Sequence, residues 1–394
     1  MHLHTLFLIL DWLIALLWMG GTFTALRNLP RIPNLLDKKY AGQLSLDPLP
    51  LISVIVPARN EAKSVEAGLR SLLAIDSITI EILAVDDRST DATGAIMDRI
   101  AGEVAAAKRM RVIHITELPA GWMGKTHAMA LAARQATSPW LLFTDADILF
   151  AQDALPRALN LAEAEQADHV VIFPTLIMKT FGEHMMIAFF QGIAALSSRF
   201  WRIPDPNAKE SLGVGAFNMV RADVYRAMGG FEALRMEVLE DLRFGFEVKR
   251  QGYRQRVAFG RDLVRVRWAI GLMGVIRNIT KNFFAVFRFR VAVTLVASGA
   301  LCLLCLGPFV ACAGGRAMCI PALIVLTMLA LLYRYYRRFT GIATAYAITF
   351  PVAACFVVYA VLRSMVVTLA RRGVQWRGTL YPLSELRKNA GPLR

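Results

Sequence analysis

The sequence has few cysteines and few histidines, and their placement argues against metal and redox centres built on them. Five cysteines occur among 394 residues, all in strongly apolar segments, together with six histidines. No histidine stands at metal-ligand spacing from a cysteine, and Cys302 and Cys305 lie in a wholly apolar stretch. We therefore expect neither a zinc site nor a dithiol pair, and interpret the cysteines as small buried apolar residues.

Acidic residues are also scarce. The chain has 30 Asp and Glu against 45 Lys and Arg, which gives a formal net charge of +15. It is 56% hydrophobic, which is too apolar for a soluble enzyme of ordinary composition. Because no motif combines aromatic with basic residues as nucleic-acid-binding proteins do, no nucleic acid is expected as a partner. We interpret the positive charge as basic loops beside an anionic membrane.

Long apolar runs at both ends predict a membrane protein. Residues 6–23 are almost unbroken apolar sequence with Asp11 as the only charge. This run lacks the basic start and the small-residue cleavage site of a signal peptide, so residues 1–27 are predicted to form a transmembrane helix. Residues 291–370 are predicted to form a second transmembrane region. Its three apolar runs are 291–313, 318–333 and 342–370.

The basic residues around these runs predict the orientation of the chain. No Lys or Arg precedes the first run, whereas Arg27 and Arg31 follow it, so the N-terminus is expected outside and the next segment in the cytoplasm. Three simple spans would then place the basic tail 371–394 outside. Because Pro351 and Arg363 interrupt the last run, we expect that run to be broken or re-entrant and the tail to be cytoplasmic.

The middle of the chain has the pattern of an α/β domain. Residues 28–50 are Pro-rich and polar and are predicted to be a linker. From residue 51, β-branched runs alternate with helical spacing, which predicts a mostly parallel sheet with helices on both faces. Residues 269–290 are predicted to form an interfacial helix. The expected strands are 52–56, 80–85, 111–115, 140–143, 168–176 and 213–220.

Polar clusters follow three of these strands, at residues 57–61, 86–91 and 145–147. Ligands of parallel α/β sheets bind beyond the carboxyl ends of the strands. Asp145 and Asp147 are spaced two apart after a buried strand, so we expect them to face the same way. Two such carboxylates repel unless a cation lies between them, and Mg²⁺ or Mn²⁺ shared with substrate phosphates suits them. The alternative is a solvated turn.

These three clusters, taken together, resemble the motifs of a known enzyme family. Residues 54–61, 85–91 and 145–147 resemble, in order and spacing, the family-2 glycosyltransferases with the GT-A fold. The resemblance covers about residues 50–270. It implies an α/β, Rossmann-like catalytic domain over residues 51–268, between N- and C-terminal transmembrane helices.

Two further motifs narrow the resemblance. Gly121 to Lys125 and the pair Glu240-Asp241 resemble the membrane-bound branch that glycosylates lipids, which includes ceramide glucosyltransferase-like and hopanoid-associated enzymes. The implied reaction moves a sugar from a nucleotide-sugar, of the UDP-sugar class, to a lipid hydroxyl, with inversion and a divalent metal. Two alternatives stay open: a processive polysaccharide synthase of the same fold, and a non-catalytic membrane protein that reuses it.

The resemblance also implies residue roles. Asp147, supported by Asp145, would hold Mg²⁺ or Mn²⁺, and Asp241 would be the general base. Asp241 could instead be a carboxylate that stabilises a helix start. Arg267 and Lys281 could bind the diphosphate, although the motif around Arg267 matches only in part. The donor-binding residues would be Pro57, Arg59, Glu61, Asp86, Asp87, Lys125 and Asp145.

Overall fold

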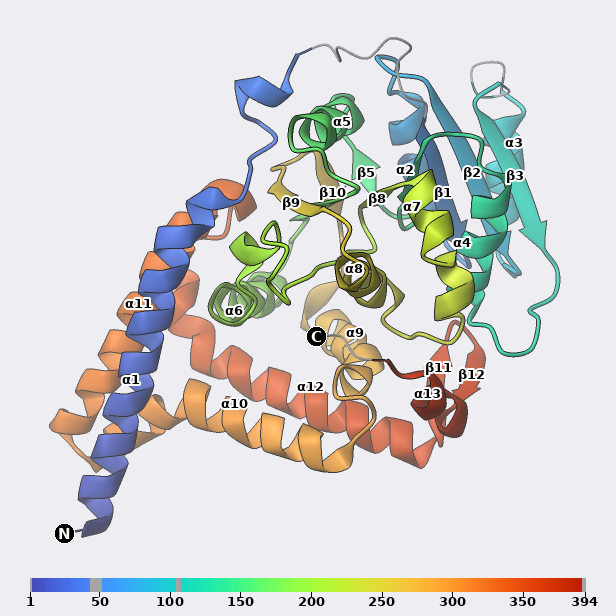
Figure 1. The fold of residues 1–394 in the computed structure, drawn as a ribbon. Coiled ribbons are helices and arrows are strands. Elements are labelled where there is room, and N and C mark those ends of the chain that lie inside the picture. Colours follow the sequence, from blue (N-terminus) through green and yellow to red (C-terminus); the bar gives the residue numbers. More distant parts are fainter. Residues whose placement is uncertain (1, 43–51, 104–105, 107, 392–394) are drawn as a thin grey trace.

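A seven-stranded sheet forms the centre of the middle part of the chain (Figure 1). The computed structural model describes residues 2–42, 52–103, 106 and 108–391. The strand order is β3-β2-β1-β4-β8-β6-β9, and every neighbouring pair is parallel except those of β8. The strands are β1 (Ile52–Ala58), β2 (Ile80–Asp87), β3 (Met110–Ile115), β4 (Trp140–Phe143), β6 (His169–Phe173), β8 (Asn218–Arg221) and β9 (Gln255–Phe259).

Helices cover both faces of the sheet, as the alternating pattern predicts. Strand β1 is buried along its whole length, because a parallel sheet with two covered faces needs apolar side chains on both. On one face, Val54 packs with α2 (Val65–Leu73), α3 (Thr93–Ala101) and α5 (Ala154–Ala164). On the other face, Ile55 packs with a second set of helices. These are α4 (Gly124–Gln135), α7 (Ala222–Ala227) and α8 (Glu240–Arg250).

Two expected strands are shorter than the sequence pattern suggests. The expected strand 168–176 is divided at Pro174, which has no N–H to donate to a ladder. Its second part, β7 (Thr175–Leu176), joins a small sheet with β5 (Leu149–Phe150) and β10 (Val264–Val266). Of the expected strand 213–220, only the part from Asn218 onward is paired with β4 and β6.

The first half of the expected linker is attached to the sheet domain. The N–H of Leu35 donates to the carbonyl of Phe259 at 2.8 Å, and the N–H of Phe259 donates to the carbonyl of Pro33 at 2.8 Å. Leu35 and Tyr40 are fully buried. Residues 29–31 and 38–40 form short 3-10 helices, η1 (Leu29–Arg31) and η2 (Lys38–Tyr40). Residues 43–50 of the expected linker lie outside the described residues.

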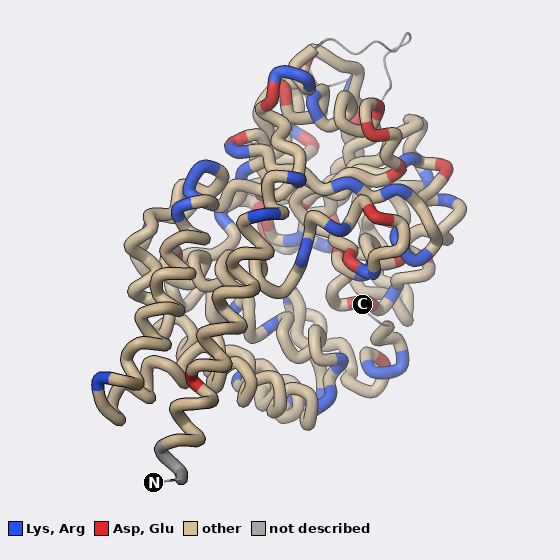
Figure 2. The backbone as a smooth tube through the Cα atoms, turned by 60° about the vertical axis from the view of Figure 1, so that its left-hand side comes forward, with Lys and Arg blue, Asp and Glu red and all other residues tan. Residues whose placement is uncertain are grey.

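Among the residues that the structure describes, four helices are long and apolar enough to cross a membrane. Helix α1 lies along α11, and α10 lies along α12 (Figure 1). Figure 2 shows that these helices carry few charged residues along their length, whereas charges of both signs cover the sheet domain. The helices are α1 (His2–Asn28), α10 (Val291–Ala311), α11 (Arg316–Thr340) and α12 (Phe350–Ala370).

The boundaries of these helices differ from the expected runs. Helix α11 runs through Arg337 to Thr340, so it is longer at both ends than the expected run 318–333. Pro351 lies in the first turn of α12, where its missing N–H costs no helical bond, and it does not break the helix. The irregular part lies before α12, in the 3-10 helix η6 (Thr344–Thr349).

The five cysteines are all free, and their burial differs. Cys305 is buried, as expected, whereas Cys319 and Cys355 are exposed on apolar helices.

Short elements complete the chain around these helices. They are η3 (Phe200–Arg202), η4 (Gly230–Leu234), η5 (Cys312–Gly314), β11 (Gly373–Trp376), β12 (Thr379–Pro382) and α13 (Leu383–Asn389).

Two helices, α6 (Phe181–Ser197) and α9 (Gly271–Val286), lie between the sheet domain and the long helices (Figure 1). The buried carboxylate of Glu183 joins their N-termini. It accepts hydrogen bonds from the N–H groups of Lys179 at 2.5 Å and Gly271 at 2.6 Å, and Arg267 lies 3.4 Å away. Burial alone would raise the pKa of Glu183, but these donors lower it to about 2.

We expect Glu183→Gln to lower the free energy of unfolding by about 1–3 kcal/mol, because a buried charge-assisted network loses one acceptor. The carboxylate stabilises the fold when ionised. Its contribution is therefore complete above the unfolded-state pKa of about 4.3 and is lost as the pH falls toward 2. Thermal melting of the detergent-solubilised protein at pH 7 and pH 3 measures both effects.

The matched control for this prediction is Glu103→Gln, which removes an exposed ion pair with Arg70. That change should cost less than about 1 kcal/mol. If the two variants melt alike at pH 7, Glu183 does not hold α6 and α9 together.

Candidate active site

The turn after β4 carries the two aspartates at the carboxyl edge of the sheet. Strand β4 ends at Phe143 and β5 begins at Leu149, so Asp145 and Asp147 lie on the connection between these strands. The alternation of a strand, from which we expected them to face the same way, therefore does not set their directions. Both nevertheless line one cavity of about 360 Å³. The backbone N–H of Thr144 donates to the carbonyl of Ile55 at 3.1 Å, which fixes the start of the turn against β1.

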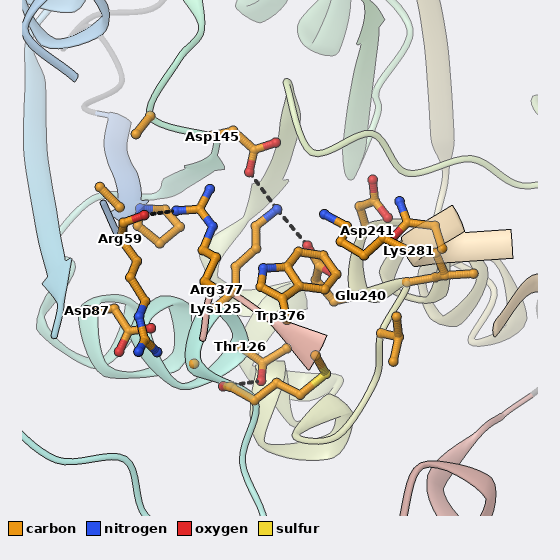
Figure 3. A pocket seen from close by; sticks show the side chains of 18 of the residues that line it. Arg59, Asp87, Lys125, Thr126, Asp145, Glu240, Asp241, Lys281, Trp376 and Arg377 are labelled. Carbon is orange, nitrogen blue, oxygen red and sulfur yellow. Dashed lines mark hydrogen bonds and ion pairs between the residues drawn. The ribbon is translucent and has the colours of Figure 1, made fainter. Parts of the chain in front are cut away.

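The walls of this cavity come from parts of the chain that are far apart in sequence (Figure 3). The ends of β1 and β2, the starts of α4 and α8, and helix α9 all contribute. The C-terminal hairpin β11–β12 closes one side. The polar lining residues are Arg59, Glu61, Asp87, Lys125, Thr126, Asp145, Asp147, Glu237, Glu240, Asp241, Asn278, Lys281, Asn282 and Arg377.

Lys125 connects the two groups of carboxylates. Its Nζ lies 2.5 Å from Oδ1 of Asp145 and 2.6 Å from Oε1 of Glu240 (Figure 3). Burial alone would lower the pKa of Lys125, but the neighbouring carboxylates raise it, so the amine stays charged. The same ion pair outweighs burial at Asp145 and lowers the pKa of that carboxyl. The turn after β4 and the start of α8 are therefore tied through one cation.

A second link between these groups passes through the backbone of Gly215. The N–H of Asp145 donates to the carbonyl of Gly215 at 3.0 Å, and the N–H of Gly215 donates to Oδ2 of Asp241 at 2.9 Å. A Cβ at this position would lie 2.7 Å from Oδ2 of Asp145, so a side chain here would displace that carboxylate. Residue 215 thus positions both aspartates at once.

Asp241 is the residue in this group with the properties of a proton acceptor. It lies in the first turn of α8, and burial together with the charge of Glu240 raises its pKa to about 6. Its Oδ1 also accepts the N–H of Leu242 at 2.8 Å. A carboxylate that titrates near pH 6 is ionised at neutral pH and is a stronger base than an ordinary aspartate.

The carboxylate of Asp147 has two acidic neighbours, Asp145 and Glu61. Burial, Asp145 and Glu61 raise its pKa to about 6, and among the described residues no cationic side chain forms an ion pair with it. Such a group favours a bound cation, and its oxygens are ligands that Mg²⁺ and Mn²⁺ prefer. Within the described ranges no group of three or more His, Cys, Asp or Glu could hold a metal. The residues present thus fit a metal whose other ligands come from a substrate.

Residues expected at the nucleotide end also line the cavity. Pro57 lies near the end of strand β1 and Arg59 follows the strand, where its Nη1 donates to Oγ1 of Thr379 at 3.3 Å. Asp87 ends β2, where both of its oxygens accept from the guanidinium of Arg88 at 2.7 and 3.1 Å.

The structure does not bring two of the expected residues to the cavity. Asp86 precedes Asp87 on β2, so its side chain points to the opposite face, where it contacts Nδ1 of His114 at 3.2 Å. The expectation that both aspartates face the cleft is therefore wrong for Asp86. Arg267 is likewise held away, by Glu183, whereas the other expected diphosphate residue, Lys281, lines the cavity.

The C-terminal hairpin is the part of the site that the sequence analysis missed. Trp376, Arg377 and Tyr381 line the cavity, and the hydroxyl of Tyr381 accepts the N–H of Gly124 at 3.1 Å. In the sequence, the aromatic residues Trp376 and Tyr381 within a basic tail were a sign that the tail has a functional role. No local pattern, however, indicates that a tail about 250 residues further along the chain returns to the start of α4.

Comparisons with known proteins agree with this arrangement. Residues 53–229 match the model of the Glycosyl transferase family 2. The 4,4'-diaponeurosporenoate glycosyltransferase of Staphylococcus haemolyticus is 27% identical over 213 residues, which cover 53% of each chain. That of Staphylococcus aureus is 24% identical over 197 residues, which cover 49% of this chain and 50% of the relative. The chain thus spans about half the length of the curated relatives it matches.

A solved structure matches over a longer range. The mannosyltransferase PcManGT from Pyrobaculum calidifontis, in complex with GDP-Man and Mn²⁺, superposes with a TM-score of 0.52 at 20% identity and covers 89% of this chain and 99% of its own. This likeness concerns the fold, which is the mixed, mostly parallel sheet of GT-A proteins. The chain therefore carries a glycosyltransferase family 2 domain with the GT-A fold, as the sequence motifs predict.

Proposed function

We propose that this protein transfers a sugar from a nucleotide-sugar to a lipid acceptor at a membrane surface. One observation carries the proposal. A single cavity has the Asp145–Asp147 turn on one side and Asp241 on the other, and Lys125 and Gly215 fix the two sides relative to each other. An inverting transfer requires this division, with groups that stabilise the leaving diphosphate opposite a base that activates the acceptor.

The donor would lie across the cavity, with its nucleoside near Arg59 and Asp87. Carboxylate oxygens there can accept hydrogen bonds from ribose hydroxyls or a base N–H. A nucleoside diphosphate-sugar is supported by the fold and by the GDP-Man bound in the structural neighbour. As the resemblance in sequence implies, we propose that the donor is a UDP-sugar.

Asp147, with Asp145, would hold Mg²⁺ or Mn²⁺ together with the donor's phosphates. When bound, such a metal neutralises the charge that develops on the leaving diphosphate. Mn²⁺ in the structural neighbour supports this assignment. Lys281, whose pKa is lowered to about 8 by burial and by Lys125, would add a positive charge on the same side at neutral pH.

Asp241 would act on the acceptor. It takes the proton of the acceptor hydroxyl while the oxygen forms a bond to the anomeric carbon and the bond from that carbon to the diphosphate breaks. The relatives' names point to a carotenoid acid, whose carboxylate is already ionised at neutral pH and needs no base. The acceptor's reactive group therefore decides whether Asp241 is essential.

The position of the membrane helices supports a lipid as acceptor. A second cavity of about 770 Å³ lies beside Leu242, the residue after Asp241. It is lined by Phe200 of η3, by Val286 at the end of α9 and by Arg288 in the following turn. A lipid that enters here from the membrane side could reach Asp241 with its polar end.

The contacts of the C-terminal hairpin support a particular topology. Arg377 contacts Arg59 and Glu61, so the sheet domain and the residues after 370 lie on the same side of the membrane. Helices α10, α11 and α12 must then cross an even number of times. Helix α12 packs along α9 and leads to the hairpin (Figure 1), so we propose that α10 and α11 cross and that α12 does not. The catalytic domain and the tail would face the cytoplasm.

The direct test of the proposed reaction follows radiolabelled sugar from a nucleotide-sugar in a membrane extract. Metal-dependent label in the organic phase supports lipid glycosylation. Insoluble labelled polymer would favour the processive synthase instead. Absence of any transfer with UDP- and GDP-sugars would favour the non-catalytic alternative.

We expect Asp147→Asn to remove most turnover without a change in melting temperature. The amide keeps the shape of the side chain but supplies a weaker ligand for a hard cation. Transfer should also stop in EDTA and return with added Mn²⁺ or Mg²⁺. Parent-like activity of this variant in EDTA would contradict the metal role.

We expect Asp241→Asn to lower turnover by roughly 10²- to 10⁴-fold if the acceptor is a hydroxyl, because the amide cannot take a proton. The parent's rate should rise with pH through about 6, as Asp241 ionises, and the variant should lose this rise. Calorimetry with the nucleoside diphosphate should show unchanged affinity. A rate close to the parent's would reject the base and favour a carboxylate acceptor.

The topology predicts which cysteines an impermeant thiol reagent reaches in intact cells. In a variant whose five native cysteines are replaced, Leu6→Cys should be labelled, whereas Arg337→Cys and Gly378→Cys should react only after the cells are opened. Labelling of Arg337→Cys in intact cells would overturn the orientation. Labelling of Gly378→Cys alone would show that α12 crosses the membrane.

A further inference from the structure

The turn of the C-terminal hairpin places an arginine in an unfavourable backbone conformation. Trp376 pairs with Thr379 across a two-residue connection, and Arg377 and Gly378 have φ angles of 46° and 83°. Such turns favour Asn, Asp or Gly at both positions, because a side chain at positive φ meets its own backbone. Arginine here carries a conformational cost, which indicates that its side chain has a use.

The guanidinium of Arg377 points into the cavity and binds groups at its centre. It forms an ion pair with the carboxylate of Glu61 and donates to the carbonyl of Arg59. In Figure 3 it lies between Arg59 on one side and Lys125 on the other. This is the middle of the cavity, between the proposed nucleoside end and the carboxylates that face the acceptor.

A second cation lies on the other side of the hairpin. The Nζ of Lys281 is 3.5 Å from the ring centroid of Trp376, a cation–π contact. Within the described part of the chain no carboxylate forms an ion pair with Lys281, which is half-buried. A half-buried cation with an aromatic neighbour and no ion-paired carboxylate favours a bound anion.

The hairpin is firmly anchored. Tyr381 is buried and its hydroxyl accepts the N–H of Gly124, at the start of the helix that carries Lys125. Val374, Leu383 and Leu386 are buried in one cluster with Met123 and residues of α9 and α12. The hairpin therefore holds Trp376 and Arg377 at fixed positions, as a built part of the cavity.

We propose that Arg377 and the Trp376–Lys281 pair form the binding site for the diphosphate of the donor. The inference rests on the proposed function and assigns its diphosphate site to the C-terminal hairpin. A diphosphate joins the nucleoside to the sugar, so it must lie between Asp87 and Asp241, where these two cations are found. Arg377 exchanges the carboxylate of Glu61 for phosphate oxygens, which its planar guanidinium can bind in pairs.

The test compares a nucleoside diphosphate with its nucleoside. We expect Arg377→Gln in the full-length protein to weaken binding of UDP or GDP by roughly 10- to 100-fold, the loss typical of a charge-assisted contact, and to leave uridine or guanosine unchanged. Arg377→Lys should recover part of the loss. Calorimetry on detergent-solubilised protein with Mn²⁺ measures both ligands.

The matched control is Arg371→Gln, which removes a positive charge from the same tail. Arg371 is exposed and donates to Gln375, outside the cavity, so both ligands should bind to this variant as to the parent. An equal loss of diphosphate and nucleoside affinity in Arg377→Gln, or an unchanged diphosphate affinity, would overturn the inference but not the proposed function. Failure of the parent to bind any nucleoside diphosphate would overturn both.

Discussion

The site depends on one half-buried cation. Lys125 lies between Asp145, on the turn after β4, and Glu240, at the start of α8. Carboxylates held close together without a cation would repel one another and take up protons, and the turn and the helix would separate. The ion pairs keep Asp145 ionised and hold α8 where its next residue, Asp241, faces the cavity. Gly215 adds a backbone link between the same two elements, and a side chain there would displace the carboxylate of Asp145.

The membrane helices contribute to the site as well as anchoring it. Helix α12 packs against α9 and leads directly into the hairpin that covers the cavity. Helix α9 carries Lys281, and the N-terminus of α9 is held to α6 by Glu183. Changes in the packing of these helices would therefore move the cations that face the proposed donor. The sheet domain and the long apolar helices form one structural unit around the cavity.

Much of the sheet domain could be predicted from the sequence. The apolar runs at residues 52–56, 80–85 and 140–143 form strands, and the polar residues after them meet at one edge, because parallel strands align their carboxyl ends. The errors have local causes. Asp86 was assigned to the cleft together with Asp87, although neighbours on a strand face opposite ways. Arg267 was assigned to the diphosphate, although a buried carboxylate binds it elsewhere.

The apolar helices, the parallel sheet and the three polar clusters of the family domain could be predicted from the sequence alone, because each follows from short-range periodicity and spacing. Which residues share the cavity is visible only in the three-dimensional structure. Lys125 meets Glu240 across 115 positions of the chain, and Arg377 meets Glu61 across 316. Contacts of this kind depend on how whole helices pack. The sequence next to each of these residues therefore does not indicate which distant residue it contacts.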